Sequence, residues 1–455
     1  MQLAILTAVL AAIAAAESGG GPVVGVAWRL IVVGSATLIA PLAALVGTQR
    51  LTRICSAEDG DDAFWRLQTA VVGLWLGTVA LMLLVAQWPR IVRGNWHLAG
   101  WPLVDELAIL APVIAPLILV WAVLYRVERA AQVASYRARN MTPPPPRMAS
   151  YVWLQIRHQL AMVLLPPLVV VGLIEVLLSL RIMPTNVDAA WWFILPLIGM
   201  MLVLMPLAVR CIWQTSSLME NPLREILDGV CIGRKCRVRD ILIWHTDDTL
   251  ANAAVVGMSR HLRYLLLTDL LVNRLNDCEL AAVARHELAH LRRWHLPLRM
   301  AVLLVPVVWW LAIKNAWPTV DAPLEWLLTA AGVDGKRWLV LCLPLGMLAY
   351  ALVAVGRFSR FLEHDADLDA CYDDQGRLNQ TCADDFCSAL TTLCGSGRES
   401  RLSQWLHPLV VERVKFLRVA MLSPDCAAAF RWRLPVAATV IVALYVAAAA
   451  ITLLG

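Results

Sequence analysis

Long apolar runs separated by short polar segments make up most of the chain. A helix that crosses a bilayer needs about 20 mainly apolar residues, and eight runs have about that length: 25–47, 67–88, 104–125, 159–182, 190–209, 298–316, 337–356 and 434–454. A ninth run, 2–16, is shorter and lacks the basic residues that precede a cleavable signal peptide, so we interpret it as a marginal first span or an anchor. The pattern predicts a mainly α-helical, polytopic membrane bundle of eight or nine spans.

The polar stretches between these runs predict the domain organisation. Residues 1–209 are expected to form an N-terminal membrane region of five or six spans, and 434–455 a C-terminal span. Residues 210–433 are expected to form one polar domain, which the spans 298–316 and 337–356 interrupt.

The arginine distribution predicts the orientation in the membrane. The connection 126–158 carries six arginines, no lysine and a single acidic residue, Glu128. Short cytoplasmic connections concentrate positive charge, so this connection is expected to lie in the cytoplasm. Counting spans onward places both polar segments, 210–297 and 357–433, on the same cytoplasmic side of a cell (inner or plasma) membrane.

Composition agrees with a protein whose main partner is the lipid bilayer. Apolar residues make up 60% of the chain and charged residues 16%, against about 45–50% and about 25% in soluble domains. These values exclude an ordinary soluble enzyme and a disordered chain. The net charge of +5 is modest, and no basic stripe alternates with aromatic residues, so nucleic acid is not an expected partner.

One polar helix carries a pattern that is typical of zinc chemistry. The segment begins with Asn276 and Glu279, which resemble a capping box, and Pro297 is expected to end the helix. Inside it, His286 and His290 are four residues apart, so both imidazoles project from one face and can bind one zinc ion per chain. Glu287 is offset by one position, which places its carboxylate beside the open site of the metal as a general base.

Two classes of zinc peptidase differ in the third ligand. A metzincin needs Gly at 293 and His at 296, but Arg293 and Leu296 occupy these positions and exclude that class. We interpret the neighbouring His295 as a solvated or packing histidine. A gluzincin takes a Glu from a later helix, and Glu363 is a candidate in the segment 359–367.

Asp367 follows Glu363 by four residues and therefore lies on the same helical face. It is a candidate to orient a ligand histidine from behind. The predicted topology supports this set, because it places both helices on one side of the membrane.

The motifs together resemble the membrane zinc metallopeptidases that include the HtpX heat-shock protease and the CAAX prenyl protease. The resemblance covers about 210–420 and consists of Asn252-Ala253 with Gly257, the stretch RYLLLTD at 263–269, HELAH at 286–290, two spans, SRFLEHDAD at 359–367, and HPLVVERV at 407–414. It implies a cytoplasmic α+β gluzincin-type domain, in which His286, His290 and Glu363 bind zinc, Glu287 is the base and Asp367 supports a ligand.

The resemblance also implies a substrate and further site residues. Residues Asn252 to Val256, with Asn252 and Ala253 foremost, would offer an edge strand to an extended peptide. His407 and Arg413 would lie near the cleft, where they stabilise the oxyanion or fix the C-terminal helix. The expected activity is hydrolysis of peptides or membrane proteins, in membrane-protein quality control or processing.

Two other functions compete with this interpretation. A sensor-transducer metalloprotease of the beta-lactam-receptor type shares the HExxH motif, but the segments around 263 and 407 favour the first family. A non-catalytic scaffold or transporter draws support only from Arg29 and Glu175, two ionisable residues inside apolar runs. The cysteines are interpreted as mostly reduced, partly buried thiols, and the group Cys371, Cys382, Cys387 and Cys394 is a weaker candidate for a structural metal or an oxidation-sensitive site.

Overall fold

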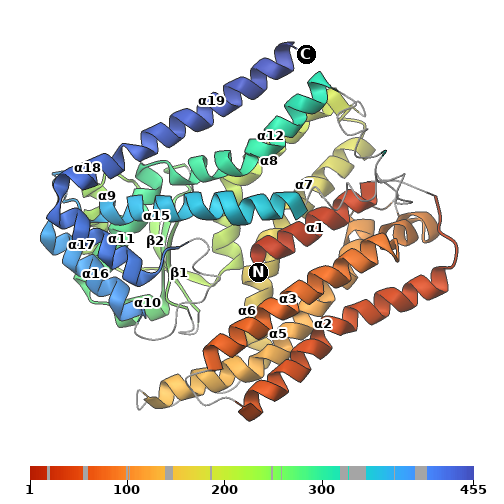
Figure 1. The fold of residues 1–455 in the computed structure, drawn as a ribbon, viewed down its shortest axis with the longest axis horizontal. Helices are drawn as coiled ribbons and strands as arrows, with labels where there is room; N and C mark the ends of the chain where they lie inside the picture. The colour runs from red at the N-terminus through yellow and green to blue at the C-terminus, as the bar shows by residue number, and fades with distance from the viewer. Residues whose placement is uncertain are drawn as a thin grey trace. The chain divides into compact units, whose positions relative to one another are not determined.

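A computed structural model describes residues 1–17, 21–54, 60–98, 101, 103–138, 147–184, 187–246, 250–257, 259–317, 326, 345–373, 375–394 and 407–454 (Figure 1). The chain divides into two compact units. Unit 1 comprises Met1–Leu202 and Leu324–Leu348, and unit 2 comprises Val203–Pro323 and Ala349–Gly455.

Helices form all of the regular structure described in unit 1: α1 Gln2–Glu17, α2 Val26–Ile54, α3 Gly60–Leu84, α4 Trp88–Arg90, the π-helical η1 Ile91–Asn95, α5 Val104–Ala138, α6 Met148–Gln155, the π-helical η3 Ile156–Ala161, α7 Met162–Ser179 and the first part of α8 Val187–Ile212. Unit 2 holds the end of α8, β1 Thr215–Ser217, α9 Pro222–Gly233, β2 Asp240–Trp244, β3 Ala253–Val256, β4 Tyr264–Thr268, α10 Asp269–Arg274, α11 Asp277–Arg292, α12 His295–Ala316, the π-helical η4 Ala351–Val355, α15 Gly356–Ala370, α16 Gln380–Cys394, α17 Val410–Leu422, α18 Pro424–Arg431 and α19 Arg433–Leu454.

The chain is a polytopic helical membrane protein, as the apolar runs predict. Within the described residues, seven helices are long and apolar enough to cross a membrane: Val26–Leu51, Ala63–Leu84, Val104–Ala130, Met148–Ser179, His295–Ala316, Leu345–Ala370 and Pro424–Leu453. The predicted run 190–209 lies within α8, and the short run 2–16 forms α1. Of the run 337–356, residues 337–344 lie outside the described residues, as does the proline run Pro143 to Pro146.

Prolines inside the spans create polar contacts between helices. Pro112 has no N–H to donate to the carbonyl of Ala108, four residues before it, and that carbonyl instead accepts from the Trp88 indole at 3.2 Å. In unit 2, Pro306 in the same way releases the carbonyl of Val302, which accepts from the Tyr350 hydroxyl at 2.7 Å. Side chains thus satisfy backbone groups that lipid cannot.

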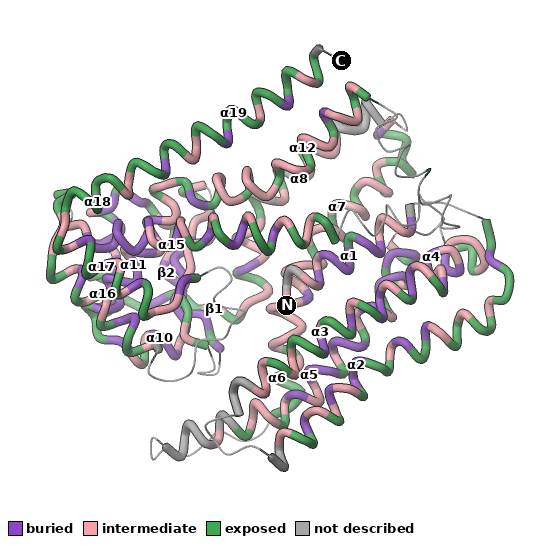
Figure 2. Tube along the Cα trace, viewed as in Figure 1, coloured by how far each residue is buried: buried purple, intermediate pink, exposed green. Residues whose placement is uncertain are grey.

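A four-stranded sheet organises the polar part of unit 2. The strand order is β1-β2-β4-β3, with β2 and β4 parallel and the two outer strands antiparallel to their neighbours. Every residue of β4 is buried, as expected of a central strand. Helix α11 packs against α9, β3, α15 and α16, and Leu280, Ala284 and Leu288 belong to its buried core face, which is purple in Figure 2.

The predicted start of α11 is confirmed, and its predicted end is wrong. Asn276 Oδ1 accepts from the Glu279 N–H at 2.9 Å, and Glu279 Oε2 accepts from the Asn276 N–H at 3.0 Å, so the capping box is complete. The helix ends at Arg292, before Pro297, because Trp294 adopts a left-handed conformation with φ of 61°. Pro297 lies in the first turn of α12, where a missing N–H is tolerated.

One helical segment carries both a membrane span and the segment that contains Glu363. Residues from Leu345 continue through the π-helical η4 into α15 without a break. The apolar end of this segment, α12 and α19 expose apolar side chains such as Leu352, Leu311 and Val440, and α19 is largely green in Figure 2. Such exposure is expected of helices that face lipid.

This arrangement makes a prediction about sidedness. Because α11 and α15 lie together in unit 2, cysteines introduced at the exposed positions His245 and Gln380 should react with a membrane-impermeant maleimide from the same side. We expect that side to be the cytoplasm, together with position 140 in the arginine-rich connection. The experiment requires a background without the exposed native thiols Cys211, Cys278 and Cys426.

A cysteine at Pro184, in the connection expected on the other side, is the control and should react only from outside. Reaction of positions 245 and 380 from opposite sides would contradict the fold of unit 2.

Candidate metal centre

Helix α11 brings its two histidines together as their spacing predicts. His286 is buried, with 5% of its surface exposed, and His290 follows one turn later. The Nε2 atoms of the two rings are 3.3 Å apart. Both rings therefore present Nε2 to the same point.

Glu363 on α15 completes the group from the opposite side. Its carboxylate is buried, with Oε2 at 3.5 Å from His286 Nε2 and Oε1 at 3.6 Å from His290 Nε2. The three possible ligand atoms all lie within 4.8 Å of one another. The structure thus brings together all three residues that the sequence suggested as ligands.

The donor set and its spacing fit a zinc ion. Imidazole nitrogen and carboxylate oxygen are ordinary zinc ligands, and bonds of about 2.0–2.2 Å at tetrahedral angles give edges of roughly 3.3–3.6 Å between ligand atoms. The two Nε2 atoms are 3.3 Å apart, and they lie 3.5 and 3.6 Å from different oxygens of the Glu363 carboxylate, which is close to these edges. Three protein ligands leave one tetrahedral position for water or substrate, as in catalytic zinc sites.

Asp367 and Arg413 support the histidine from behind. Asp367 is fully buried, and its Oδ1 lies 3.0 Å from His286 Nδ1. Arg413 on α17 donates to both carboxylate oxygens, from Nε at 2.9 Å and from Nη2 at 2.5 Å. Because its guanidinium is engaged in this bidentate pair, Arg413 connects α17 to the candidate ligand His286 through Asp367.

The two histidines differ in their charge in the absence of a metal. Burial lowers the pKa of both, but for His286 the carboxylates of Asp367 and Glu363 outweigh burial and raise the pKa to about 9. His290 keeps a pKa well below its usual value because burial dominates. His290 is thus neutral, the form that binds metals, whereas a metal at His286 must displace a proton.

Glu287 lies among the charges of the site. Burial raises the pKa of its carboxyl to about 7, against the opposing influence of the cations His286, His407 and Arg413. His407 Nδ1 approaches Glu363 Oε2 at 2.9 Å, and its side chain is 54% exposed. His407 therefore lies where the site opens to solvent, next to the carboxylate that faces both histidines.

The predicted peptide-binding segment is an edge strand. Strand β3 pairs with β4 on one side and is last in the strand order. Asn252 and Thr268 form a backbone-bonded pair, with Thr268 N donating to Asn252 O at 3.0 Å. Because such pairs alternate in an antiparallel ladder, the N–H groups of Ala253 and Val255 point away from β4.

Sequence reasoning missed two residues that contact the candidate ligands, His295 and Arg299, and a third, Asp365, that contacts His295. His295 is buried rather than solvated, and it bonds to His290 and to Asp365. Arg299 on α12 donates to Glu363 Oε1 at 3.4 Å. Residues five positions apart do not lie on the same face of one helix, so the spacing of His290 and His295 does not predict a contact. The contact forms because the helix breaks at Trp294.

Residues singled out elsewhere have ordinary partners. Arg29 donates to the carbonyls of Val85 at 2.9 Å and Ala86 at 3.3 Å, at the end of α3. Glu175 accepts from the Leu103 N–H at 2.9 Å and lies near Asp105 and Glu106, both of which pair with Arg93.

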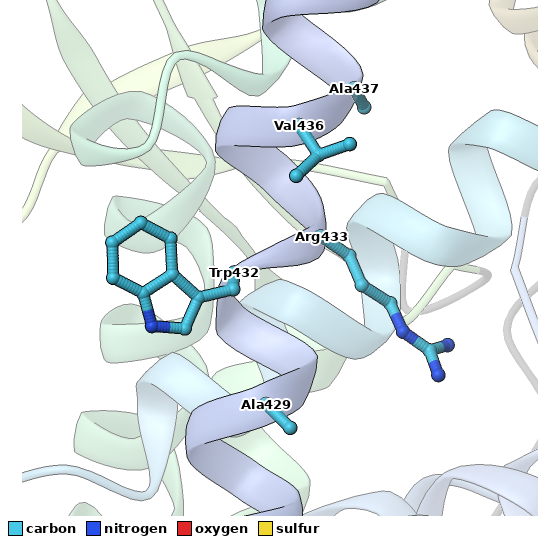
Figure 3. Close-up of a pocket in the computed structure, with 5 residues that line it drawn as sticks. All are labelled: Ala429, Trp432, Arg433, Val436 and Ala437. Atoms are coloured by element: carbon cyan, nitrogen blue, oxygen red, sulfur yellow. The ribbon is translucent and has the colours of Figure 1, made fainter.

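The cysteines and the surface pocket do not join the centre. The eight cysteines whose side chains are described, Cys371, Cys382 and Cys387 among them, form no disulfide, and burial raises the pKa of the Cys371 thiol. The side chain of Cys394 lies outside the described residues. Figure 3 shows a pocket of about 300 Å³ along α18 and α19, lined by Ala429, Trp432, Arg433, Val436 and Ala437.

Comparison with known proteins identifies a family for the part of the chain that contains these residues. Residues 237–420 match the family described as Peptidase family M48. Among solved structures, the crystal structure of S. mikatae Ste24p is similar at 15% sequence identity and a TM-score of 0.47, over 88% of this chain and 100% of that chain. No curated protein matches the sequence. The family resemblance inferred from the motifs is confirmed, and the chain carries a peptidase family M48 domain over residues 237–420.

Proposed function

We propose that the protein is an integral-membrane zinc metalloendopeptidase that hydrolyses peptide bonds with Glu287 as general base. This proposal rests on the close approach of His286, His290 and Glu363. The last two of these residues are 73 positions apart in the sequence and lie on two different helices. The M48 domain supports the class of reaction.

His286, His290 and Glu363 would hold the ion. When bound, zinc would lower the pKa of a coordinated water to about 7 and polarise the scissile carbonyl. Asp367 and Arg413 keep the His286 ring in place, so that the site is ordered before substrate arrives.

Glu287 moves the proton. As a carboxylate it accepts a proton from the attacking water, and after the tetrahedral species forms it delivers that proton to the leaving amine. A carboxyl whose pKa is raised towards 7 is suited to both steps, because its proton affinity lies near working pH. His407, which is exposed beside Glu363, would donate to the developing oxyanion.

Strand β3 would hold the substrate as an additional, extended strand. The outward N–H and C=O groups of Val255 and the outward C=O of Ala253 offer main-chain hydrogen bonds that do not depend on side chains of the substrate, whereas the Ala253 N–H already donates to Asn252 Oδ1 at 3.0 Å. We therefore expect extended or unfolded segments to be cleaved.

The distance to the membrane favours membrane-tethered substrates. Within the helical segment Leu345–Ala370, Glu363 follows the last residue of the apolar run 337–356 by seven residues, or roughly 10 Å at 1.5 Å per residue. His295 begins the span α12 beside the site. A cytoplasmic centre so close to the bilayer suits the quality control or processing of membrane proteins.

The competing functions draw less support. A sensor-transducer protease of the beta-lactam-receptor type would use the same chemistry, but the M48 match covers HELAH, the SRFLEHDAD segment and the HPLVVERV segment together. The scaffold or transporter alternative depended on Arg29 and Glu175, and hydrogen bonds to backbone groups account for both.

The first prediction of this proposal concerns the metal. Purified protein should contain about one zinc per chain, and the double variant His286→Ala/His290→Ala should contain almost none. Glu363→Ala should weaken zinc binding, because two histidines and water hold the ion poorly, and Asp367→Ala should lower affinity about 10–100-fold. Full zinc content in the double variant, measured by elemental analysis, would refute the centre.

The second prediction separates chemistry from binding. Glu287→Gln preserves the size of the side chain and should retain zinc, while cleavage of a casein-type substrate falls by at least about 10²–10⁴-fold. Glu225→Gln, on the exposed surface of α9, is the matched control and should cleave like wild type. Wild-type cleavage by the zinc-loaded Glu287 variant would show that the protein is not this kind of peptidase.

The third prediction concerns strand β3. Val255→Pro removes one outward N–H without breaking a bond to β4, so kcat/KM for a peptide should fall about 3–10-fold at unchanged zinc content, as expected for one lost hydrogen bond of about 0.5–1.5 kcal/mol. Val255→Ala, which keeps the N–H, should fall less. Equal values for the two variants would assign the effect to the side chain instead.

A further inference from the structure

His295 is buried beside the centre, yet the proposed reaction gives it no part. Only 1% of its surface is exposed. It is the first residue of α12, and it lies five positions after the ligand His290. A single continuous helix would not bring two residues at this spacing together.

A strained break in the backbone turns His295 back towards His290. Helix α11 ends at Arg292, and Trp294 adopts φ of 61°, a conformation that non-glycine residues adopt rarely and at a cost. Packing of the indole against the rest of the protein does not offset this cost, because Trp294 is 68% exposed. The consequence of the break is the position of the His295 ring.

The ring of His295 connects the ligand to a buried carboxylate. His295 Nδ1 lies 2.9 Å from His290 Nδ1, and His295 Nε2 lies 2.9 Å from Asp365 Oδ2. Asp365 is 1% exposed and also accepts from Arg293, at 2.9 Å from Nη2 to Oδ1. The chain Asp365–His295–His290 therefore runs from a fixed carboxylate to a metal ligand.

When both rings are neutral, one arrangement of protons satisfies every contact in this chain. A carboxylate only accepts, so His295 donates from Nε2 and, as a neutral ring, accepts at Nδ1. His290 then donates from Nδ1, which leaves the lone pair of its Nε2 directed at His286 Nε2 and Glu363. This is the tautomer of His290 that a metal at the centre requires.

We propose that His295 is a positioning residue that, anchored by Asp365, fixes the ring orientation and tautomer of His290 for zinc. The inference rests on the proposed zinc centre and extends it. The two ligand histidines are then supported from the same helix, because Asp367 contacts His286 directly and Asp365 reaches His290 through His295.

The test measures the zinc affinity of the metal-stripped, full-length protein by competition with a chelating dye, without substrate. His295→Phe keeps a ring of similar size but loses both hydrogen bonds, and its zinc affinity should fall about 10–100-fold. His295→Asn places a carboxamide oxygen near the position of Nδ1, where it can accept from His290. Its affinity should recover to within about threefold of wild type, because the hydrogen bond to the ligand is restored.

Two controls separate positioning from stability. His261→Phe, on the exposed surface of the same unit, should bind zinc like wild type. Both His295 variants lose the bond to Asp365, so the melting temperatures of their metal-free forms should be similar while their zinc affinities differ.

Each result bears on the proposal. Equal zinc affinity of the Phe and Asn variants, at wild-type level or below it, would overturn the role of His295 while leaving the zinc centre in place. A wild-type protein that binds no zinc would overturn the proposed function, and this inference with it.

Discussion

Four carboxylates lie buried at alternate positions of α15, and the neutralisation of their charge is the constraint on which unit 2 depends. They are Glu363, Asp365, Asp367 and Asp369, each at most 1% exposed. Burying an unpaired carboxylate costs several kcal/mol, and removing one partner of a buried pair typically costs about 3–5 kcal/mol. Each carboxylate must therefore receive a cation or a hydrogen-bond donor from a neighbouring helix.

Residues on or at the ends of five neighbouring helices supply these partners. Asp369 accepts from Arg234 at the end of α9 and from Arg292 at the end of α11, and it also pairs with Arg431 at the end of α18. Asp367 pairs with Arg413 on α17, and Asp365 with His295 at the start of α12. Three of these arginines lie at helix C-termini, where positive charge also stabilises the helix. The charges on α15 thus fix how the helices around it pack.

Glu363, the carboxylate in the candidate centre, is the one of the four whose charge no close arginine neutralises among the described residues. Glu363 contacts His286, His290, His407 and Arg299, none of which forms the close bidentate pair that Arg413 makes with Asp367. An ion between the carboxylate and the two histidines would neutralise this charge. The same helix therefore provides both the structural charges and the candidate ligand Glu363, and its carboxylates at 365 and 367 would help to hold the two histidines around the ion.

Sequence predicts the parts of this arrangement that depend on local order. The spans follow from the length of apolar runs, the start of α11 from Asn276 and Glu279, and the ligand pair from the spacing of His286 and His290. The contacts of His295 and Asp365 cannot be predicted in this way, because they depend on the left-handed conformation of Trp294. Glycine and asparagine are the residues that usually indicate such a conformation, and neither occupies this position. The continuous helix from Leu345 to Ala370 is also not predicted from the sequence, because a polar segment after an apolar run usually indicates the end of a helix.

Zinc K-edge X-ray absorption spectroscopy of the purified, full-length protein tests the central claim most directly. A centre of His286, His290, Glu363 and water predicts four nitrogen or oxygen neighbours at about 2.0–2.1 Å, with multiple-scattering features of two imidazoles. Sulfur neighbours at about 2.3 Å would place the metal on cysteines and would contradict the account. A spectrum without imidazole scattering would contradict it equally.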